Sequence, residues 1–352
     1  MSTQRGRIQI TGFDPEEVER RDSLSELDVP AEEQADVEGR WQRAWENFRG
    51  DRSAMLGLGI VVVMILIAIF SRPITAFGMQ IQPIGLAPYD PATQHFGFLE
   101  AGTDAGRNVS PFERPFEHPM GTDGNARDLF SRILIGGRYS ISIGFIVVLL
   151  TAGVGIIYGA ISGYYGGWVD EVMMRFVDVI FAFPGLLLAL VIVAVLGGGY
   201  WQLVLAFALP GWAGYARLIR GEILSVKENE YVMAAKALGA RDSSVIFRHV
   251  VPNSIAPVIV QASLSIGTVV IGVAALGFLG VGFAAGTPEW GTILDQNLDS
   301  LQRGPGSSIL WWQTFFPGAA IFLFVMAVNM IGDGINDALN AQSEDLVVGG
   351  GG

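Results

Sequence analysis

Six separate apolar runs constrain the fold of this chain more than any other feature. Most of them are at least as long as the ~17 residues that a helix needs to cross a membrane. The runs are Ala54–Phe70, Ile141–Tyr164, Val172–Leu196, Trp201–Ile219, Ile255–Val281 and Thr314–Ile331. Only 16% of the 352 residues are charged, against roughly 25% in a soluble domain. A soluble core rarely contains six such runs, so the sequence predicts an all-α membrane protein with six transmembrane helices.

The distribution of arginine and lysine predicts the orientation of these helices. The loop 217–252 carries six basic residues, whereas the loop after the fifth run carries only Arg303. Short loops rich in Arg and Lys face the cytoplasm. We therefore expect both termini in the cytoplasm and segment 71–138 outside it. The core of five helices is then residues 139–335, followed by a cytoplasmic tail at 336–352.

The residues before the first span divide into two parts. Residues 1–40 are rich in Glu, Asp and Arg without apolar periodicity, which predicts a disordered, acidic cytoplasmic arm. The chain as a whole has a net charge of −12. Either the arm binds a basic partner, or its acidity reflects a high-salt or high-GC host, and we favour the host explanation. Trp45, Phe48 and Arg49 follow at helical spacing, so 41–53 is predicted to be an interfacial helix.

Cysteine and histidine usage limits the chemistry of the chain. There is no cysteine, which excludes disulfides, thiol catalysis and cysteine-ligated metals. His95 and His118 lie in the external segment without the spacing of metal ligands, so no metal site is expected. The first apolar run follows about fifty mainly polar residues, so 54–70 is predicted to be an uncleaved first span and not a removable signal peptide.

Glycines and prolines within the runs predict packing faces and breaks. Gly155, Gly159 and Gly163 recur every fourth residue, which favours a helix face where a neighbouring backbone approaches closely. Proline removes a backbone donor and bends a helix. Interruptions are therefore expected at Pro184 in the third span and at Pro210 in the fourth.

Polar residues within the fifth run indicate a pathway. Gln261, Ser265 and Thr268 share one helix face by their spacing. Polar groups are costly in hydrocarbon, so they should face protein or a water-filled path. The three residues are candidate pathway-lining residues, and hydrogen bonding between packed helices is an equal alternative.

The basic loop between the fourth and fifth spans is expected to form two short helices. The first covers roughly Glu228–Leu238. Four residues share one side of it: Tyr231, Ala234, Ala235 and Leu238. Gly239 would end it in the left-handed conformation that glycine tolerates. Asp242 would cap a second helix reaching His249, which Pro252 would end. A rigid projecting pair of helices suits a groove in a partner protein.

Five segments together resemble one family of membrane proteins. They are PYDP at Pro88–Pro91, HPMGTDGNARDLFSR at His118–Arg132, GYYGGWVDEVMMRFVD at Gly163–Asp178, the loop at Glu230–Pro252 and GDGINDAL at Gly332–Leu339. With these motifs the chain, over about residues 40–340, is similar to the inner-membrane permeases of dipeptide, oligopeptide and nickel ATP-binding-cassette (ABC) importers. It resembles the DppC/OppC-like member of the permease pair in particular.

The resemblance implies a fold and a set of partners. The fold would be the type I ABC-importer permease fold in a lipid bilayer, beside a homologous second permease, two cytoplasmic ATPases and an extracytoplasmic binding protein. The ATPases would hold ATP and Mg²⁺, because this chain has no G-x-x-x-x-G-K-[ST] phosphate loop. Loop 217–252, here named the coupling loop, would couple ATP hydrolysis to uptake. No catalytic residue, cofactor or metal is expected on this chain, and no nucleic acid among its partners.

Several alternatives stay open at this level. Asp123, Arg127 and Asp128 precede the second span and would form an external gate or docking element, or simply an ion-paired helix start. The default substrate is a dipeptide or oligopeptide, although relatives carry nickel and other small solutes. An ion-coupled secondary transporter would need charges deep in the membrane or an inverted repeat. A membrane scaffold would leave the coupling loop unexplained.

Overall fold

The computed structural model describes residues 42–76, 79–94, 106–284, 286–298 and 310–349. Within these ranges the chain is helical apart from its loops and one antiparallel hairpin, β1 (Ile74–Ala76) with β2 (Met79–Gln82). The acidic arm predicted at residues 1–40 lies outside the described residues.

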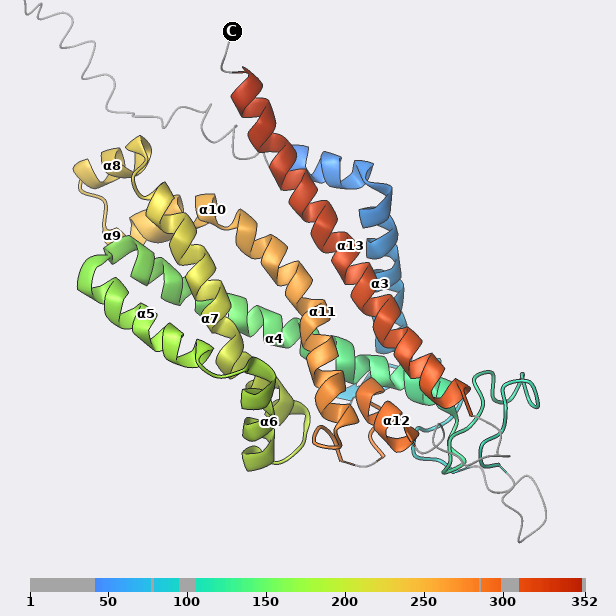
Figure 1. The fold of residues 1–352 in the computed structure, drawn as a ribbon. Coiled ribbons are helices and arrows are strands. Elements are labelled where there is room, and N and C mark those ends of the chain that lie inside the picture. The colour runs from blue at the N-terminus through green and yellow to red at the C-terminus, as the bar shows by residue number, and fades with distance from the viewer. Residues whose placement is uncertain (1–41, 77–78, 95–105, 285, 299–309, 350–352) are drawn as a thin grey trace, which may run out of the picture.

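The described helices form a bundle with two distinct ends (Figure 1). In chain order they are 42–50, α3 (Arg52–Phe70), α4 (Leu129–Tyr165), α5 (Gly167–Phe181), α6 (Gly185–Leu196), α7 (Tyr200–Val226), α8 (Glu230–Ala237), α9 (Asp242–Ser244), the π-helical segment η3 (Val245–Val250), α10 (Val251–Ser254), α11 (Ala256–Phe278), α12 (Trp290–Gln296) and α13 (Trp312–Gly349). α8 and α9 lie at one end of the bundle and α12 at the other. We refer to these as the α8 end and the α12 end.

Among the described residues, four helices are long and apolar enough to cross a membrane: α3, α4, α11 and α13. α5 and α6 together would make a fifth span, bent by 79° at the break between them. The predicted fourth span, α7, does not pass the same test, because Gln202, Pro210 and Arg217 interrupt its apolar residues. The helical membrane protein is therefore confirmed, with four or five spans by length and composition in place of six.

α4 and α13 extend well beyond the apolar runs that predicted them. α4 begins at Leu129 and not near Ile141, so its first turns belong to the stretch predicted as external segment 71–138. Ser131 and Arg132 in these turns are fully buried, which a count of apolar residues cannot anticipate. α13 likewise continues from Trp312 through the predicted tail to Gly349.

The two prolines act differently. Pro184 separates α5 from α6, which confirms the predicted interruption of the third span. α7 instead runs unbroken through Pro210, so the interruption predicted there is wrong. The next residue packs tightly on α4, since a Cβ at Gly211 would lie 2.8 Å from Thr151 Cγ2. α7 therefore lies close against α4 immediately after the proline.

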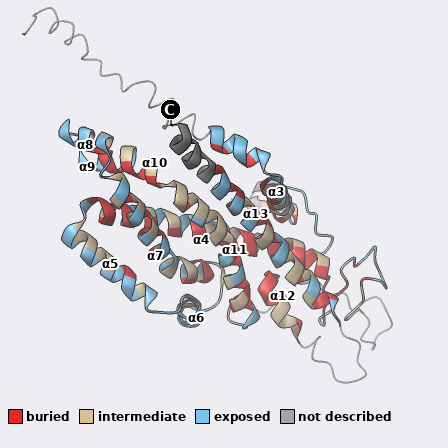
Figure 2. Ribbon diagram, turned by 45° about the horizontal axis from the view of Figure 1, so that its top comes forward, coloured by how far each residue is buried: buried red, intermediate tan, exposed pale blue. Residues whose placement is uncertain are grey.

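The glycine face of α4 packs against α7. A Cβ at Gly155 would lie 2.4 Å from Tyr215 Cβ, and one at Gly159 would lie 2.2 Å from the carbonyl oxygen of Ala216. Such distances leave room for hydrogen only, so the two backbones touch. The predicted close-approach face is confirmed, and its partner is α7. Figure 2 shows, in contrast, mostly exposed residues on α5 and α8.

The predicted interfacial helix at 41–53 is shorter than expected. The helix covers 42–50, and Asp51 then caps α3 by accepting a hydrogen bond from the backbone N–H of Ser53 at 2.8 Å. Phe48 is buried against α3 and α13, while Trp45 stays exposed. An aspartate in the capping position starts a new helix, which is why the earlier helix ends before it.

Candidate functional site

The coupling loop projects as two short helices from the α8 end (Figure 1). α8 covers Glu230–Ala237, and Gly239 follows with φ +84°. The predicted left-handed helix end is therefore confirmed. Nothing lies within 4 Å of a Cβ added at Gly239, so glycine is required there for its backbone conformation and not for space.

The second helix differs from the prediction at both ends. Arg241, and not Asp242, occupies the capping position, and the Asp242 carboxylate instead accepts a hydrogen bond from the Tyr164 hydroxyl at 2.8 Å. The helical path also continues past Pro252 through α10 to Ser254. Pro252 lies in the first turn of α10, where its missing N–H removes no helical bond.

The side predicted for α8 is divided between two directions. Val232 is fully buried against α7 and η3, and Tyr231 and Ala235 pack beside it. Ala234 and Leu238 are exposed, Leu238 by 79%. The large apolar side chains that are exposed in this part of the loop are Met233, Leu238 and Phe247. Sequence reasoning missed Val232, which is the anchor of α8, because its burial depends on η3.

Tyr164, near the end of α4, joins the coupling loop to the bundle. Besides its hydrogen bond to Asp242, its ring lies 4.4 Å from the Lys236 ammonium nitrogen. The Lys227 ammonium, between α7 and α8, donates to the carbonyl oxygen of Gly163 at 2.8 Å. Sequence reasoning did not select Tyr164, although it lies in the motif Gly163–Asp178.

At the α12 end, the three candidate gate residues are brought together and buried. Asp123 accepts from Arg127 Nε at 2.8 Å and from its backbone N–H at 2.9 Å. Asp128 caps α4 through the backbone N–H of Ser131 at 2.7 Å, and lies 2.9 Å from His118 Nδ1. Arg127 is only 6% exposed, and both aspartates are buried. The three residues are therefore part of the buried interior of the α12 end and not of its surface.

The same cluster reaches α12 through an arginine that sequence reasoning missed. Arg127 and the fully buried Arg132 each donate to Gln296 Oε1 at 2.8 Å. Arg132 also lies 3.8 Å from the Asp123 carboxylate. The last residue of α12 is thereby tied to the start of α4.

Glu289, also missed, holds the other end of α12. It is fully buried and accepts from the backbone N–H groups of Gly291 at 2.9 Å and Thr292 at 2.8 Å. The Ser140 hydroxyl of α4 donates to it at 3.0 Å. Burial raises the pKa of Glu289, and these hydrogen bonds oppose that rise. α12 is consequently fixed to α4 at both of its ends.

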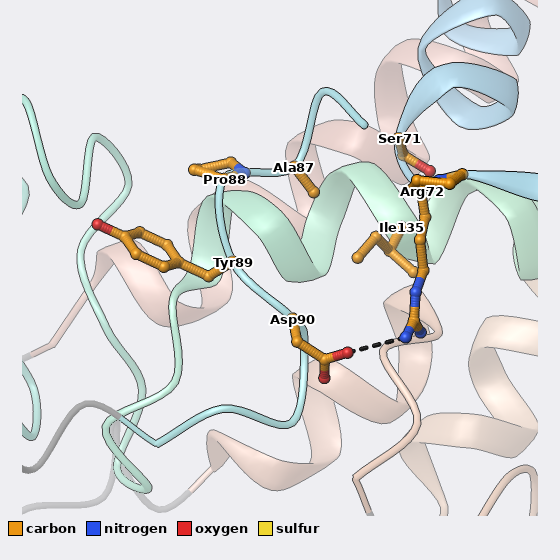
Figure 3. A pocket seen from close by; sticks show the side chains of 8 residues that line it. Ser71, Arg72, Ala87, Pro88, Tyr89, Asp90 and Ile135 are labelled. Carbon is orange, nitrogen blue, oxygen red and sulfur yellow. Dashed lines mark hydrogen bonds and ion pairs between the residues drawn. The ribbon is translucent and has the colours of Figure 1, made fainter. Parts of the chain in front are cut away.

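The motif Pro88–Pro91 lies along the start of α4 (Figure 3). Asp90 forms a 2.9 Å ion pair with Arg72, and the backbone N–H of Tyr89 donates to Ser131 Oγ at 3.1 Å. A hollow of about 170 Å³ lies between this segment and Ile135 of α4. The motif therefore joins the segment after α3 to the first turns of α4.

The three candidate pathway residues lie on one exposed to half-buried face of α11. Gln261 Nε2 donates to Ser265 Oγ at 3.1 Å, and Thr268 is exposed. Farther along this face, Ile271 lines a groove of about 600 Å³ that runs along α13. Asn329 and Asp333 of α13 also line this groove.

The described residues form a bundle of membrane-length helices, which is the architecture of a multi-pass membrane protein, and two short helices project from one end of it. Residues 155–343 match the family described as the binding-protein-dependent transport system inner membrane component. Residues 39–102 match the N-terminal TM domain of oligopeptide transport permease C.

Relatives cover most of the chain. A dipeptide transport system permease protein DppC from Alkalihalophilus pseudofirmus is 38% identical over 89% of this chain and 93% of its own. A glutathione transport system permease protein GsiD from Shigella dysenteriae is 36% identical over 86% of this chain and 90% of its own. An inward-facing structure of the MetNI methionine ABC transporter covers 56% of this chain and 93% of its own, with 14% identity and a TM-score of 0.43.

The chain belongs to the family of binding-protein-dependent transport system inner membrane components. It is a multi-pass permease subunit of an ABC importer, which transports and does not catalyse a reaction, and an ATPase and a binding protein are its partners in general terms. The importer interpretation therefore replaces the two alternatives that the sequence left open, an ion-coupled secondary transporter and a membrane scaffold.

Proposed function

We propose that the chain forms half of the translocation pathway of a short-peptide importer, and that a homologous second permease forms the other half. The observation that carries the substrate class is similarity, over 86% of the chain or more, to permeases named for dipeptide and glutathione transport. Glutathione is itself a short peptide, so both names describe one chemical class.

The α8 end would face the cytoplasm and two ATPases, which hold ATP and Mg²⁺. The coupling loop at this end carries exposed Lys236, Arg241 and Arg248, as the positive-inside rule requires. Its exposed Leu238 and Met233 suit an apolar groove in an ATPase. The α12 end would then face the binding protein outside the cell, with both chain termini in the cytoplasm.

In the assembled importer, α7 would be the remaining span of a six-helix, type I permease. Its polar residues have partners within the chain: Arg217 forms a 2.6 Å ion pair with Asp178 of α5, and Arg220 pairs with Asp170. Such pairing lowers the cost of placing charge near a membrane. Packing on the glycine face of α4 shields a further side of this helix.

The pathway would run along the exposed face of α11 that carries Gln261, Ser265 and Thr268. This face leads to the groove at Ile271, and its polar groups suit a polar peptide backbone. The buried Asp123–Arg127 pair would act on an external gate indirectly, because Arg127 donates to Gln296 of α12. Asp128 would contribute by holding His118 at the start of α4. Nothing in this arrangement requires a cofactor on this chain.

Reconstitution tests the proposal directly. Proteoliposomes that contain the chain, the second permease, the ATPases and the binding protein are expected to take up labelled dipeptides or glutathione when ATP is present. Uptake restricted to Ni²⁺ or another non-peptide solute would contradict the substrate class and leave the importer role intact.

Leu238→Asp tests the coupling loop in the same system. The charge replaces a 79% exposed leucine, so the ATPases are expected to be lost when the tagged chain is purified in mild detergent. Glu171→Gln, an exposed change on α5, serves as the control and should retain them. Recovery of the ATPases with Leu238→Asp would contradict the proposed contact.

A further inference from the structure

Tyr164 touches both helices of the coupling loop with one side chain. Its hydroxyl donates to Asp242 at the start of α9, and its ring lies 4.4 Å from Lys236 at the end of α8. The side chain is only 7% exposed and packs in the cluster that also contains Val232 and Val245. A movement of either helix therefore acts on this residue.

The structure around Tyr164 is stiff. Gly155 and Gly159 place the α4 and α7 backbones in contact. Asp170 of α5 accepts from both the Arg220 guanidinium of α7 and the Ser162 hydroxyl of α4. Because α4, α5 and α7 are joined in this way, we expect a displacement at Tyr164 to move the three helices together.

α4 carries that displacement to the opposite end of the bundle. Asp128, which caps α4, contacts His118 in the preceding loop. Arg132 and Ser140 of α4 hold the two ends of α12 through Gln296 and Glu289. One continuous helix, Leu129–Tyr165, thus links the coupling loop to the α12 end.

We propose that Tyr164 is a positioning residue through which the coupling loop moves α4 and, with it, the α12 end. The inference rests on the proposed role of the coupling loop as the ATPase contact. The hydroxyl sets the position of α9 against α4, and the ring holds the end of α8 through Lys236. Loss of the hydroxyl would leave the ATPases bound but transmit their movement poorly.

The number of peptides taken up per ATP hydrolysed, in the reconstituted importer, measures this transmission. Tyr164→Phe removes the hydrogen bond and keeps the ring, so the ratio should fall by about tenfold or more, the equilibrium effect of one hydrogen bond to a charged group. Tyr164→Leu should lower it further. The control is Tyr165→Phe, which changes the adjacent and 54% exposed tyrosine and should leave the ratio unchanged.

Variants at Asp242 separate transmission from a general loss of structure. Asp242→Asn keeps an oxygen acceptor and should retain most of the wild-type ratio. Asp242→Ala should lower the ratio as much as Tyr164→Phe does. The double variant Tyr164→Phe with Asp242→Ala should show no additional loss, because both changes remove the same bond.

Two results would overturn the inference. One is a ratio for Tyr164→Phe equal to that of the wild-type importer. The other is loss of the ATPases from purified Tyr164→Phe, which would mean that Tyr164 only supports the loop. Absence of ATP-driven uptake in the wild type would instead refute the proposed function, so the two failures are distinguishable.

Discussion

Gly159→Ala tests the close contact between α4 and α7. The new Cβ would lie 2.2 Å from the Ala216 carbonyl oxygen and 2.4 Å from Ile219 Cγ2. Non-bonded carbon atoms prefer separations of about 3.5–4.0 Å. α4 and α7 would therefore have to separate by about 1 Å, since the nearer obstacle is backbone and cannot rotate away.

The expected magnitude follows from two opposing effects. Overpacking of this kind costs typically about 1–3 kcal/mol, and a backbone obstacle places Gly159→Ala near the upper value. The better helix propensity of alanine offsets about 1 kcal/mol. We expect the free energy of unfolding to fall by about 2 kcal/mol, the difference between these values.

Gly153→Ala on the same helix is the matched control. Nothing lies within 4 Å of a Cβ there, so only the gain in propensity of up to about 1 kcal/mol applies. The assay is reversible unfolding in mixed detergent micelles, followed by tryptophan fluorescence. A Gly159→Ala protein as stable as Gly153→Ala would refute the reasoning, because the backbones could then not be in contact.

Two further predictions concern the α12 end and the pathway. Glu289→Gln should lower the free energy of unfolding by about 1–3 kcal/mol, because an amide nitrogen cannot accept a backbone N–H bond of the kind that Glu289 receives at both oxygens. Thermal unfolding measures this change, and Asp295→Asn on the same helix is the control. Since the chain has no cysteine, Thr268→Cys should be the sole site on this chain that a water-soluble maleimide labels in the assembled importer, with loss of uptake. The buried Val270→Cys should stay unlabelled, and an unlabelled Thr268→Cys would place the pathway elsewhere.

Features with a local signal could be predicted from the sequence. The run Ala54–Phe70 became α3, and Ile255–Val281 became α11, each within three residues at either end. Helix formation in such runs depends on their own apolar side chains. The glycine face of α4 and the left-handed Gly239 were predictable for the same reason, because each follows from the residue itself and its spacing.

Features that depend on distant partners could not be predicted. α4 starts at Leu129 because Arg132 and Arg138 in its first turns have partners far along the chain. Arg132 donates to Gln296, and Arg138 donates to the carbonyl oxygen of Ala68 at the end of α3. A search for apolar runs treats these arginines as polar residues that interrupt a span. The predicted span therefore begins at Ile141, after the true start of the helix.

The coupling loop shows the same limit. The rule that a proline ends a helix failed at Pro252, because η3 changes the helical winding just before it. The predicted face of α8 likewise depended on spacing within one helix, whereas Val232 is buried by η3 and α7. Tyr164 gave no signal of its own, since its partners come from elsewhere in the chain.

The length of α4 has a mechanical consequence. Its 37 residues at about 1.5 Å per residue make a rod of about 55 Å, well beyond the ~30 Å of hydrocarbon in a bilayer. A rod of this length is a lever, so each degree of rotation about one end sweeps the other through about 1 Å. A tilt of a few degrees at the coupling loop would therefore displace the α12 end by several ångströms.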